Sequence, residues 1–193
     1  MKGASADALE AALSANAGES IEWPTDRAFS TAWKQRNVYN GLSGQRCVHI
    51  LKRLNDGLRT SKMENVTING QLTIEHLMPQ NWYDNWPLAD GKKGKSAIDL
   101  ILANDSQEFV DACERRDKLV HTVGNLTLMT QPLNSSVSNR PWLEKRQAIE
   151  SSSMLPISVE LRALEKWDEE AIQARSERLL QCALKIWPGS KRM

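Results

Sequence analysis

The chain has 193 residues, of which 40% are hydrophobic and 25% charged, and its formal net charge at pH 7 is +1. This length and composition suit one globular domain with a real hydrophobic core. The small net charge excludes a general attraction to polyanions, so contact with nucleic acid requires a local basic patch. No apolar run is long enough to cross a bilayer and the first residues do not form a signal peptide, so we expect a cytoplasmic protein with no membrane contact.

The first third of the chain is predicted to be helical. An alanine-rich segment at 4–16 favours a short helix, and residues 29–39 favour a second one. The clearest helix spans 45–58, because apolar residues recur there at helical spacing, namely Cys47, Leu51, Leu54 and Leu58. We expect this helix to pack in the core.

Two short strands are predicted in the middle of the chain. A turn at Asn69-Gly70 leads into a strand at 72–74, which runs on to His76 and is stopped by Pro79. The second strand is expected near the end of 121–129.

Helices are predicted on either side of the second strand. One helix is expected over 106–118, and residues 81–104 before it are expected to be irregular. A helical stretch follows from about 132 to 151, with a break near Pro141. The last helix is the best defined, because acidic residues at 168–170 occupy its first turn, where the helix dipole favours them.

These elements predict an α+β fold that is mostly helical and forms one domain over residues 1–193. Three parts are expected within it: an N-terminal helical part at 1–65, a strand–strand–helix core at 70–150 with an insertion at 81–120, and C-terminal helices at 155–193.

Three residues near the predicted strands carry chemistry suited to phosphodiester hydrolysis: Glu75, His76 and Asn134. Hydrolysis needs a base to activate water, and a histidine titrates near neutrality. It also needs a cation, and ions such as Mg²⁺ take oxygen ligands. Adjacent residues of a strand point to opposite faces, so Glu75 and His76 share a centre only if the strand ends there and the backbone turns.

The segments around these residues resemble the C-terminal nuclease domain of GmrSD-type restriction endonucleases. That family is an HNH (ββα-metal) branch acting in defence against phage or foreign DNA. The resemblance extends from about residue 23 to about residue 188, and its motifs are IEHLMPQ at 74–80, VGNLTLM at 123–129, LNSSVSN at 133–139, EKR at 144–146, WDEEAI at 167–172 and KIWP at 185–188.

The resemblance implies a role for each of four residues. His76 is the implied general base, Glu75 and Asn134 the implied ligands of a divalent ion (Mg²⁺ or Mn²⁺), and Asn125 the residue that orients the loop around the histidine. HNH sites more often have Asp at the first metal position, and Glu75 has a longer side chain. Complete proteins of the family usually carry an N-terminal nucleotide-dependent domain, so this chain is expected to be a C-terminal piece or a separate subunit that acts on DNA.

Structural interpretations remain open for the other candidates. Asn134 is also a favoured helix N-cap, and Asn139 is a second amide in the same helical stretch. His121 belongs either to the site or to a structural hydrogen bond. Lys145 and Arg146 are expected to contact the DNA backbone, since they follow Asn134 in the same helical stretch.

Two other groups of residues are candidates for nucleic-acid contact. The lysines of a glycine-rich loop, Lys92, Lys93 and Lys95, are expected to be solvated rather than bound to phosphates. Most tryptophans are expected to be core anchors, and only Trp82 and Trp86 are considered for stacking on bases.

The sequence therefore predicts a metal-dependent DNA endonuclease of the HNH type that restricts foreign or modified DNA. The alternative is a DNA-binding or partner-docking module of a larger restriction protein, catalytically silent in isolation. RNA cleavage by the same residues is a third possibility.

Overall fold

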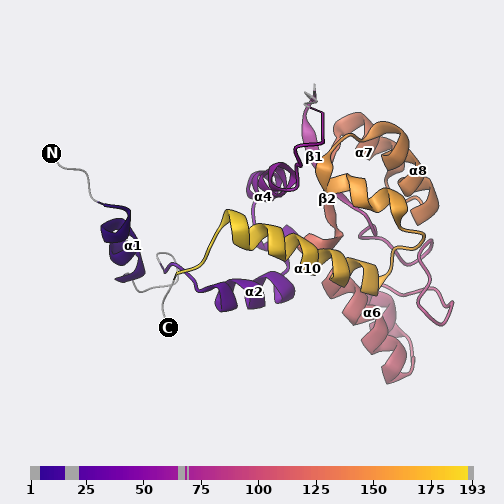
Figure 1. Ribbon diagram of the computed structural model, residues 1–193. Helices are drawn as coiled ribbons and strands as arrows, with labels where there is room; N and C mark the ends of the chain where they lie inside the picture. The colour runs from indigo at the N-terminus through magenta and orange to yellow at the C-terminus, as the bar shows by residue number, and fades with distance from the viewer. Residues whose placement is uncertain (1–4, 16–21, 65–67, 69, 191–193) are drawn as a thin grey trace.

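The computed structural model describes residues 5–15, 22–64, 68 and 70–190. Helices surround one two-stranded antiparallel sheet, formed by β1 (Leu72–His76) and β2 (Leu126–Thr130). In Figure 1 the sheet lies between α4 on one side and α7 and α8 on the other. The predicted α+β, mostly helical class is confirmed. Gly70 of the predicted turn has a φ of 141°, a conformation that glycine tolerates, and Asn69 lies outside the described residues.

The N-terminal helices are α1 (Ala6–Ala15), α2 (Asp26–Gln35), α3 (Val38–Gly41) and α4 (Gly44–Gly57). The single helix predicted over 29–39 is wrong, because the extended backbone of Arg36 separates α2 from α3. The side chain of Asn37 then caps α3 by accepting a hydrogen bond from the Asn40 amide at 2.9 Å. The predicted helix over 45–58 is confirmed as α4, which buries the expected apolar face.

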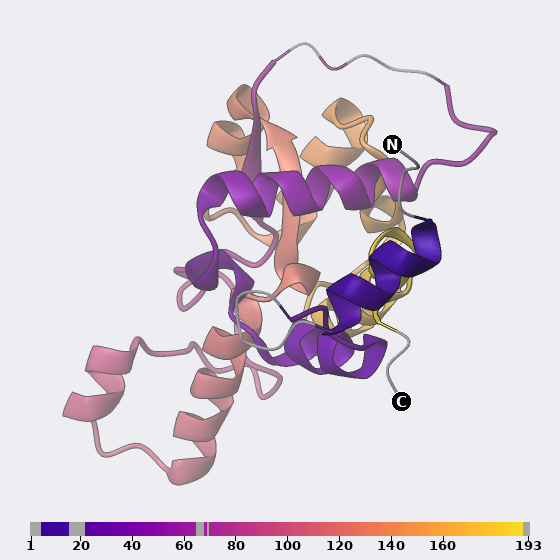
Figure 2. The same ribbon diagram turned by 90° about the vertical axis from the view of Figure 1, so that its left-hand side faces the viewer.

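The segment between the strands contains α5 (Ala97–Leu102) and α6 (Gln107–Val120). The prediction of irregular chain over 81–104 is wrong for α5, which Ser96 caps. Ile98, Ile101 and Leu102 of α5 are exposed while Leu100 packs against the core, so the apolar residues are not confined to one face and gave no amphipathic signal. Figure 2 shows α5 and α6 extending from the body of the molecule.

The chain after β2 is almost entirely helical. Its elements are α7 (Gln131–Val137), α8 (Trp142–Ser152), α9 (Pro156–Val159), the 3-10 turn η2 (Glu160–Ala163) and α10 (Glu169–Ile186). A second 3-10 turn, η1 (Val123–Asn125), precedes β2 and packs closely on α10. Gly124 permits this contact, because a Cβ there would lie 2.3 Å from the carbonyl oxygen of Ile172.

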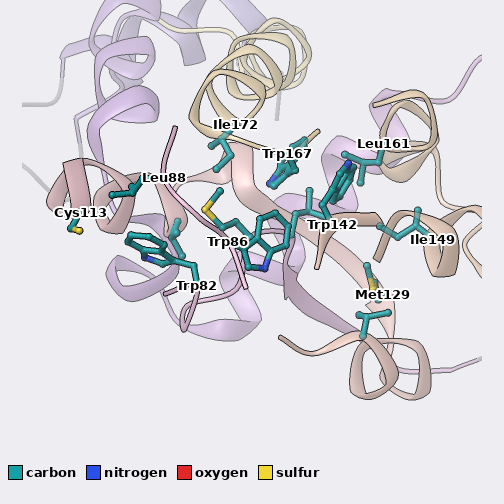
Figure 3. Packing of buried hydrophobic residues seen from close by; sticks show 14 residues of the cluster. Trp82, Trp86, Leu88, Cys113, Met129, Trp142, Ile149, Leu161, Trp167 and Ile172 are labelled. Atoms are coloured by element: carbon teal, nitrogen blue, oxygen red, sulfur yellow. The ribbon is translucent and has the colours of Figure 1, made fainter. Parts of the chain in front are cut away.

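Two apolar clusters form the core. One lies between the sheet, α4 and α10, where Leu51, Leu128 and Leu179 are fully or almost fully buried. The other gathers the residues after β1 with four tryptophans, shown in Figure 3: Trp82, Trp86, Trp142 and Trp167. Trp82 is 0% exposed and Trp86 5%, so the interpretation of these two as base-stacking residues is wrong. They join the insertion to the body of the domain.

Candidate active site

A polar pocket of about 680 Å³ opens between the end of β1, the loop that follows it and the helix α7. Four of the residues singled out in the sequence line it, namely Glu75, His76, Asn134 and Asn139. Thr73, Gln80, Gln131 and Ser135 add further polar groups. The tertiary fold therefore brings together side chains that are about 60 residues apart in the chain.

The two strands and α7 form a strand–strand–helix unit around this pocket. β1 pairs with β2 in antiparallel register, with His76 opposite Leu126, and α7 begins directly after β2. Asn134 ties the helix to β1, because its Nδ2 donates to Thr73 Oγ1 at 2.9 Å and to the Ile74 carbonyl at 3.0 Å. No described residue donates to its Oδ1. The N-cap interpretation of Asn134 is wrong, since Thr130 is the N-cap residue of α7.

The end of α7 shapes the opposite wall of the pocket. Ser138 has a φ of 30°, and it is the one non-glycine residue with a positive φ among those described. This backbone conformation costs free energy for a residue with a Cβ and commonly occurs at functional positions. It terminates α7 so that both Ser138 and Asn139 line the pocket.

Glu75 is held by a buried lysine. Lys145 of α8 is 0% exposed, and its Nζ donates to Glu75 Oε1 and, at 2.7 Å, to the carbonyl oxygen of His76. Burial raises the pKa of Glu75, against the opposing charge of Lys145, and burial lowers the pKa of Lys145. Lys145 was expected to contact the DNA backbone, but a completely buried ammonium with internal partners is not available for that contact.

His76 closes β1 and lies among aromatic rings. Its side chain is 7% exposed, with the Tyr39 ring centroid 4.4 Å away and the His121 centroid 5.5 Å away. Burial, with smaller contributions from the charges of His121 and Lys145, lowers the pKa of His76 to about 3. The imidazole is therefore neutral at pH 7. No described residue hydrogen-bonds to its buried Nε2.

β1 ends at the position that allows Glu75 and His76 to line the same pocket. His76 is the last residue of β1, and the next amide, Leu77 N, donates to the carbonyl of Asn125 at 2.9 Å. Both Glu75 and His76 then line the same pocket. The geometric condition derived from the sequence is met.

Asn125 lies behind this loop and is completely buried. Its Oδ1 accepts from Met78 N at 2.8 Å and from Trp167 Nε1 at 2.9 Å. Its Nδ2 donates to the carbonyls of Met78 at 2.8 Å and Val120 at 2.9 Å. The amide thus has four partners and does not line the pocket; it holds the backbone that follows His76.

His121 and Arg146 lie outside the pocket lining. The His121 ring packs beside that of His76, its carbonyl accepts from Val38 N at 3.1 Å, and burial lowers its pKa. The Arg146 guanidinium donates to the carbonyl of Leu164 at 3.2 Å. Tyr39 was not predicted as a neighbour of the site, because nothing local to α3 indicates a contact with a histidine 37 positions later.

The donor atoms at the pocket are of the type that a hard divalent cation takes. Across the described ranges, no group of three or more His, Cys, Asp or Glu side chains is placed to hold a metal ion. Mg²⁺ usually needs only one or two protein oxygen ligands, with waters and substrate phosphate completing the shell. The Glu75 carboxylate and Asn134 Oδ1 are two such oxygens, so the residues present fit the implied ion.

A protein-family model matches most of the chain. Residues 23–182 match the family described as GmrSD restriction endonucleases, C-terminal domain, and the chain belongs to this family. The resemblance inferred from the motifs is thereby confirmed. A search of curated proteins returned no match. In the part of the chain that the structure describes, no helix is long and apolar enough to span a membrane.

Proposed function

We propose that this domain is a metal-dependent DNA endonuclease of the HNH type that acts in the restriction of foreign or modified DNA. One observation carries the proposal: a single polar pocket gathers His76, Glu75 and Asn134 from β1 and α7, in a chain of the restriction endonuclease family. A base and two oxygen ligands beside an open cavity are what metal-assisted phosphodiester hydrolysis requires.

His76 is the proposed general base. The neutral imidazole takes a proton from the water that attacks phosphorus, and the negative charge of the bound phosphate offsets the burial that lowers its pKa. The new phosphorus–oxygen bond forms as the bond to the leaving sugar oxygen breaks, and that oxygen gains a proton from solvent. The rings of Tyr39 and His121 restrict the orientation of the imidazole.

Glu75 and Asn134 are the proposed ligands of a divalent ion, Mg²⁺ or Mn²⁺. Such an ion supplies positive charge against the phosphate and the leaving oxygen. Lys145 fixes the Glu75 carboxylate and the His76 backbone, while the hydrogen bonds of Asn134 to β1 direct its nitrogen away and leave its oxygen for the ion. Asn125 positions the loop after His76.

The proposed nuclease works together with a partner domain. The family is defined as a C-terminal domain, and the resemblance implies an N-terminal nucleotide-dependent domain or subunit. The present sequence contains no Walker-type phosphate loop, so nucleotide hydrolysis is assigned to that partner.

One observation favours the alternative, a DNA-binding or docking module that is silent in isolation. The carboxylate of Glu75 is already paired with Lys145 inside the protein, and this ion pair competes with a metal for the same group. In that case the site becomes active only when the partner domain rearranges it.

A plasmid assay tests the proposal. Supercoiled DNA is incubated with the chain in Mg²⁺ or Mn²⁺, with EDTA as the metal-free comparison. We expect nicking by the wild type and none by His76→Ala, with unchanged circular dichroism. Gln107→Ala, an exposed polar residue of α6, is the matched control and nicks normally. Nicking by His76→Ala at the wild-type rate contradicts the assignment, and DNA binding without cleavage in any divalent ion supports the silent module.

A further inference from the structure

We propose that the exposed face of α4 is a binding surface for the phosphate backbone of duplex DNA, adjoining the pocket. We define this basic face by Arg46, Lys52 and Arg53. The inference rests on the proposed function, which names DNA as the substrate. A chain of net charge +1 requires a local basic patch to bind DNA, and we assign that patch to α4.

The basic face follows from the amphipathic pattern of α4. The helix buries Cys47, Leu51 and Leu54 against the sheet and α10, so its opposite face points to solvent. Arg46 and Arg53 are seven residues apart, or two helical turns, and therefore share one stripe about 10 Å long. Lys52 is also exposed and lies about 100° around the helix from Arg53, on the side that borders the groove beside β1. Asp56 is the one acidic residue of the helix.

None of the three cations Arg46, Lys52 and Arg53 has an acidic partner among the described residues. The lysines of the glycine-rich loop are paired instead, Lys92 with Asp90 and Lys93 with Asp84. A paired cation contributes little net field, whereas the charges on α4 remain available to an anion.

A groove beside the pocket reaches the basic face at Lys52. This groove of about 710 Å³ is lined by Lys52 and Gln45 of α4 and by residues of β1. Two residues, Gln71 and Thr73, line both this groove and the pocket that contains His76. Figures 1 and 2 both show α4 lying alongside β1. The side of α4 that carries Lys52 therefore adjoins the wall of the pocket that holds the reactive residues.

The chemistry of this surface predicts how DNA is recognised. Three cations on one helix contact phosphates, and phosphate contacts position a duplex without reading its bases. The described tryptophans Trp82 and Trp86 are buried and add no stacking. We therefore expect binding through α4 to be independent of sequence and base modification, which assigns any selection of modified DNA to another part of the restriction protein.

Salt-dependent binding tests the surface. The triple variant Arg46→Gln, Lys52→Gln, Arg53→Gln is compared with Arg27→Gln, Arg115→Gln, Lys118→Gln, which removes three exposed cations from α2 and α6. Anisotropy of a labelled duplex is measured in EDTA, so that no cleavage occurs. The slope of log K against log salt should fall in magnitude by about 0.9 for each phosphate that the variant no longer neutralises, hence by about 2 to 3. The control should keep the wild-type slope.

A second measurement separates this inference from the proposed function. Hydrolysis of bis(p-nitrophenyl) phosphate by the wild type and by His76→Ala reports on the pocket without any long DNA. If the wild type hydrolyses the ester while the α4 triple variant binds DNA like the control, the surface is refuted and the proposed function stands. If the triple variant loses salt-dependent binding and no ester or plasmid is cleaved, the surface stands and the nuclease assignment fails. Absence of DNA binding by the wild type refutes the surface.

Discussion

Lys145 and Glu75 form an ion pair across 70 residues of sequence, with the lysine completely buried and the carboxylate on the wall of the pocket. The same ammonium donates to the carbonyl of His76 at 2.7 Å. One side chain of α8 therefore holds the last two residues of β1 together. This contact links the stability of the fold to the geometry of the candidate active site.

Removing the lysine should destabilise the domain. Lys145→Met leaves the Glu75 carboxylate buried without a partner, which costs about 3–5 kcal/mol. Adding Glu75→Gln removes that charge and should restore part of the stability. Urea unfolding measures both, with Lys93→Met as the exposed control. Equal unfolding midpoints for the wild type and Lys145→Met would contradict the buried ion pair.

Replacing Asn125 should strongly destabilise the domain, because its side chain holds the loop after His76. Asn125→Leu leaves buried groups of Met78, Val120 and Trp167 without partners, and each such group costs about 1–3 kcal/mol. We expect the free energy of unfolding to fall by several kcal/mol. Asn139→Ala, at the exposed rim of the pocket, should change it by less than about 0.5 kcal/mol. Equal free energies of unfolding for Asn125→Leu and Asn139→Ala would contradict this role of Asn125.

The buried His76 should make stability depend on pH. Its pKa in the folded state is about 3, below the ordinary value of 6.5, so the unfolded chain takes up a proton first as the pH falls. The contribution of His76 is fully present above pH 6.5 and is lost at about 1.4 kcal/mol per pH unit as the pH falls toward 3.

Comparison with His76→Gln separates the contribution of His76 to the pH dependence from those of other titrating groups. In EDTA, the wild type should lose stability more steeply between about pH 6 and pH 4 than His76→Gln, as measured by urea unfolding at each pH. Parallel curves for the two proteins would show that His76 titrates normally in the folded state.

Asn134 should affect the metal requirement of nicking. If its Oδ1 is a ligand, Asn134→Ala should raise the Mg²⁺ concentration for half-maximal nicking by about tenfold or more, since even groups outside the first coordination shell contribute that much. Excess Mg²⁺ should restore part of the rate, which a purely structural defect would not allow. Gln107→Ala serves as the control away from the pocket, and a Mg²⁺ dependence of Asn134→Ala equal to that of the wild type would exclude Asn134 as a ligand.

Some features of the domain could be predicted from the sequence because they depend on local patterns. The apolar spacing of α4 and the acidic first turn of α10 report which face is buried and where a helix begins, independently of the partner. The strand that ends at His76 was also predictable, since Pro79 stops it. The two motifs carrying His76 and Asn134 were sufficient to indicate the family, because they depend on residue type and order alone.

Other features were decided only by the tertiary structure. The roles of Lys145 and Trp82 were predicted incorrectly, because their exposure depends on packing between elements far apart in the chain. Local pattern placed Asn134 in a helix, but only the fold made Thr130 the N-cap residue and bound Asn134 to β1. A histidine ordinarily titrates near neutrality, and only burial among Tyr39 and His121 lowers the pKa of His76. The periodicity of the sequence indicates which face of a helix or strand is buried. The desolvation of a side chain and its hydrogen-bond partners depend instead on contacts between distant parts of the chain.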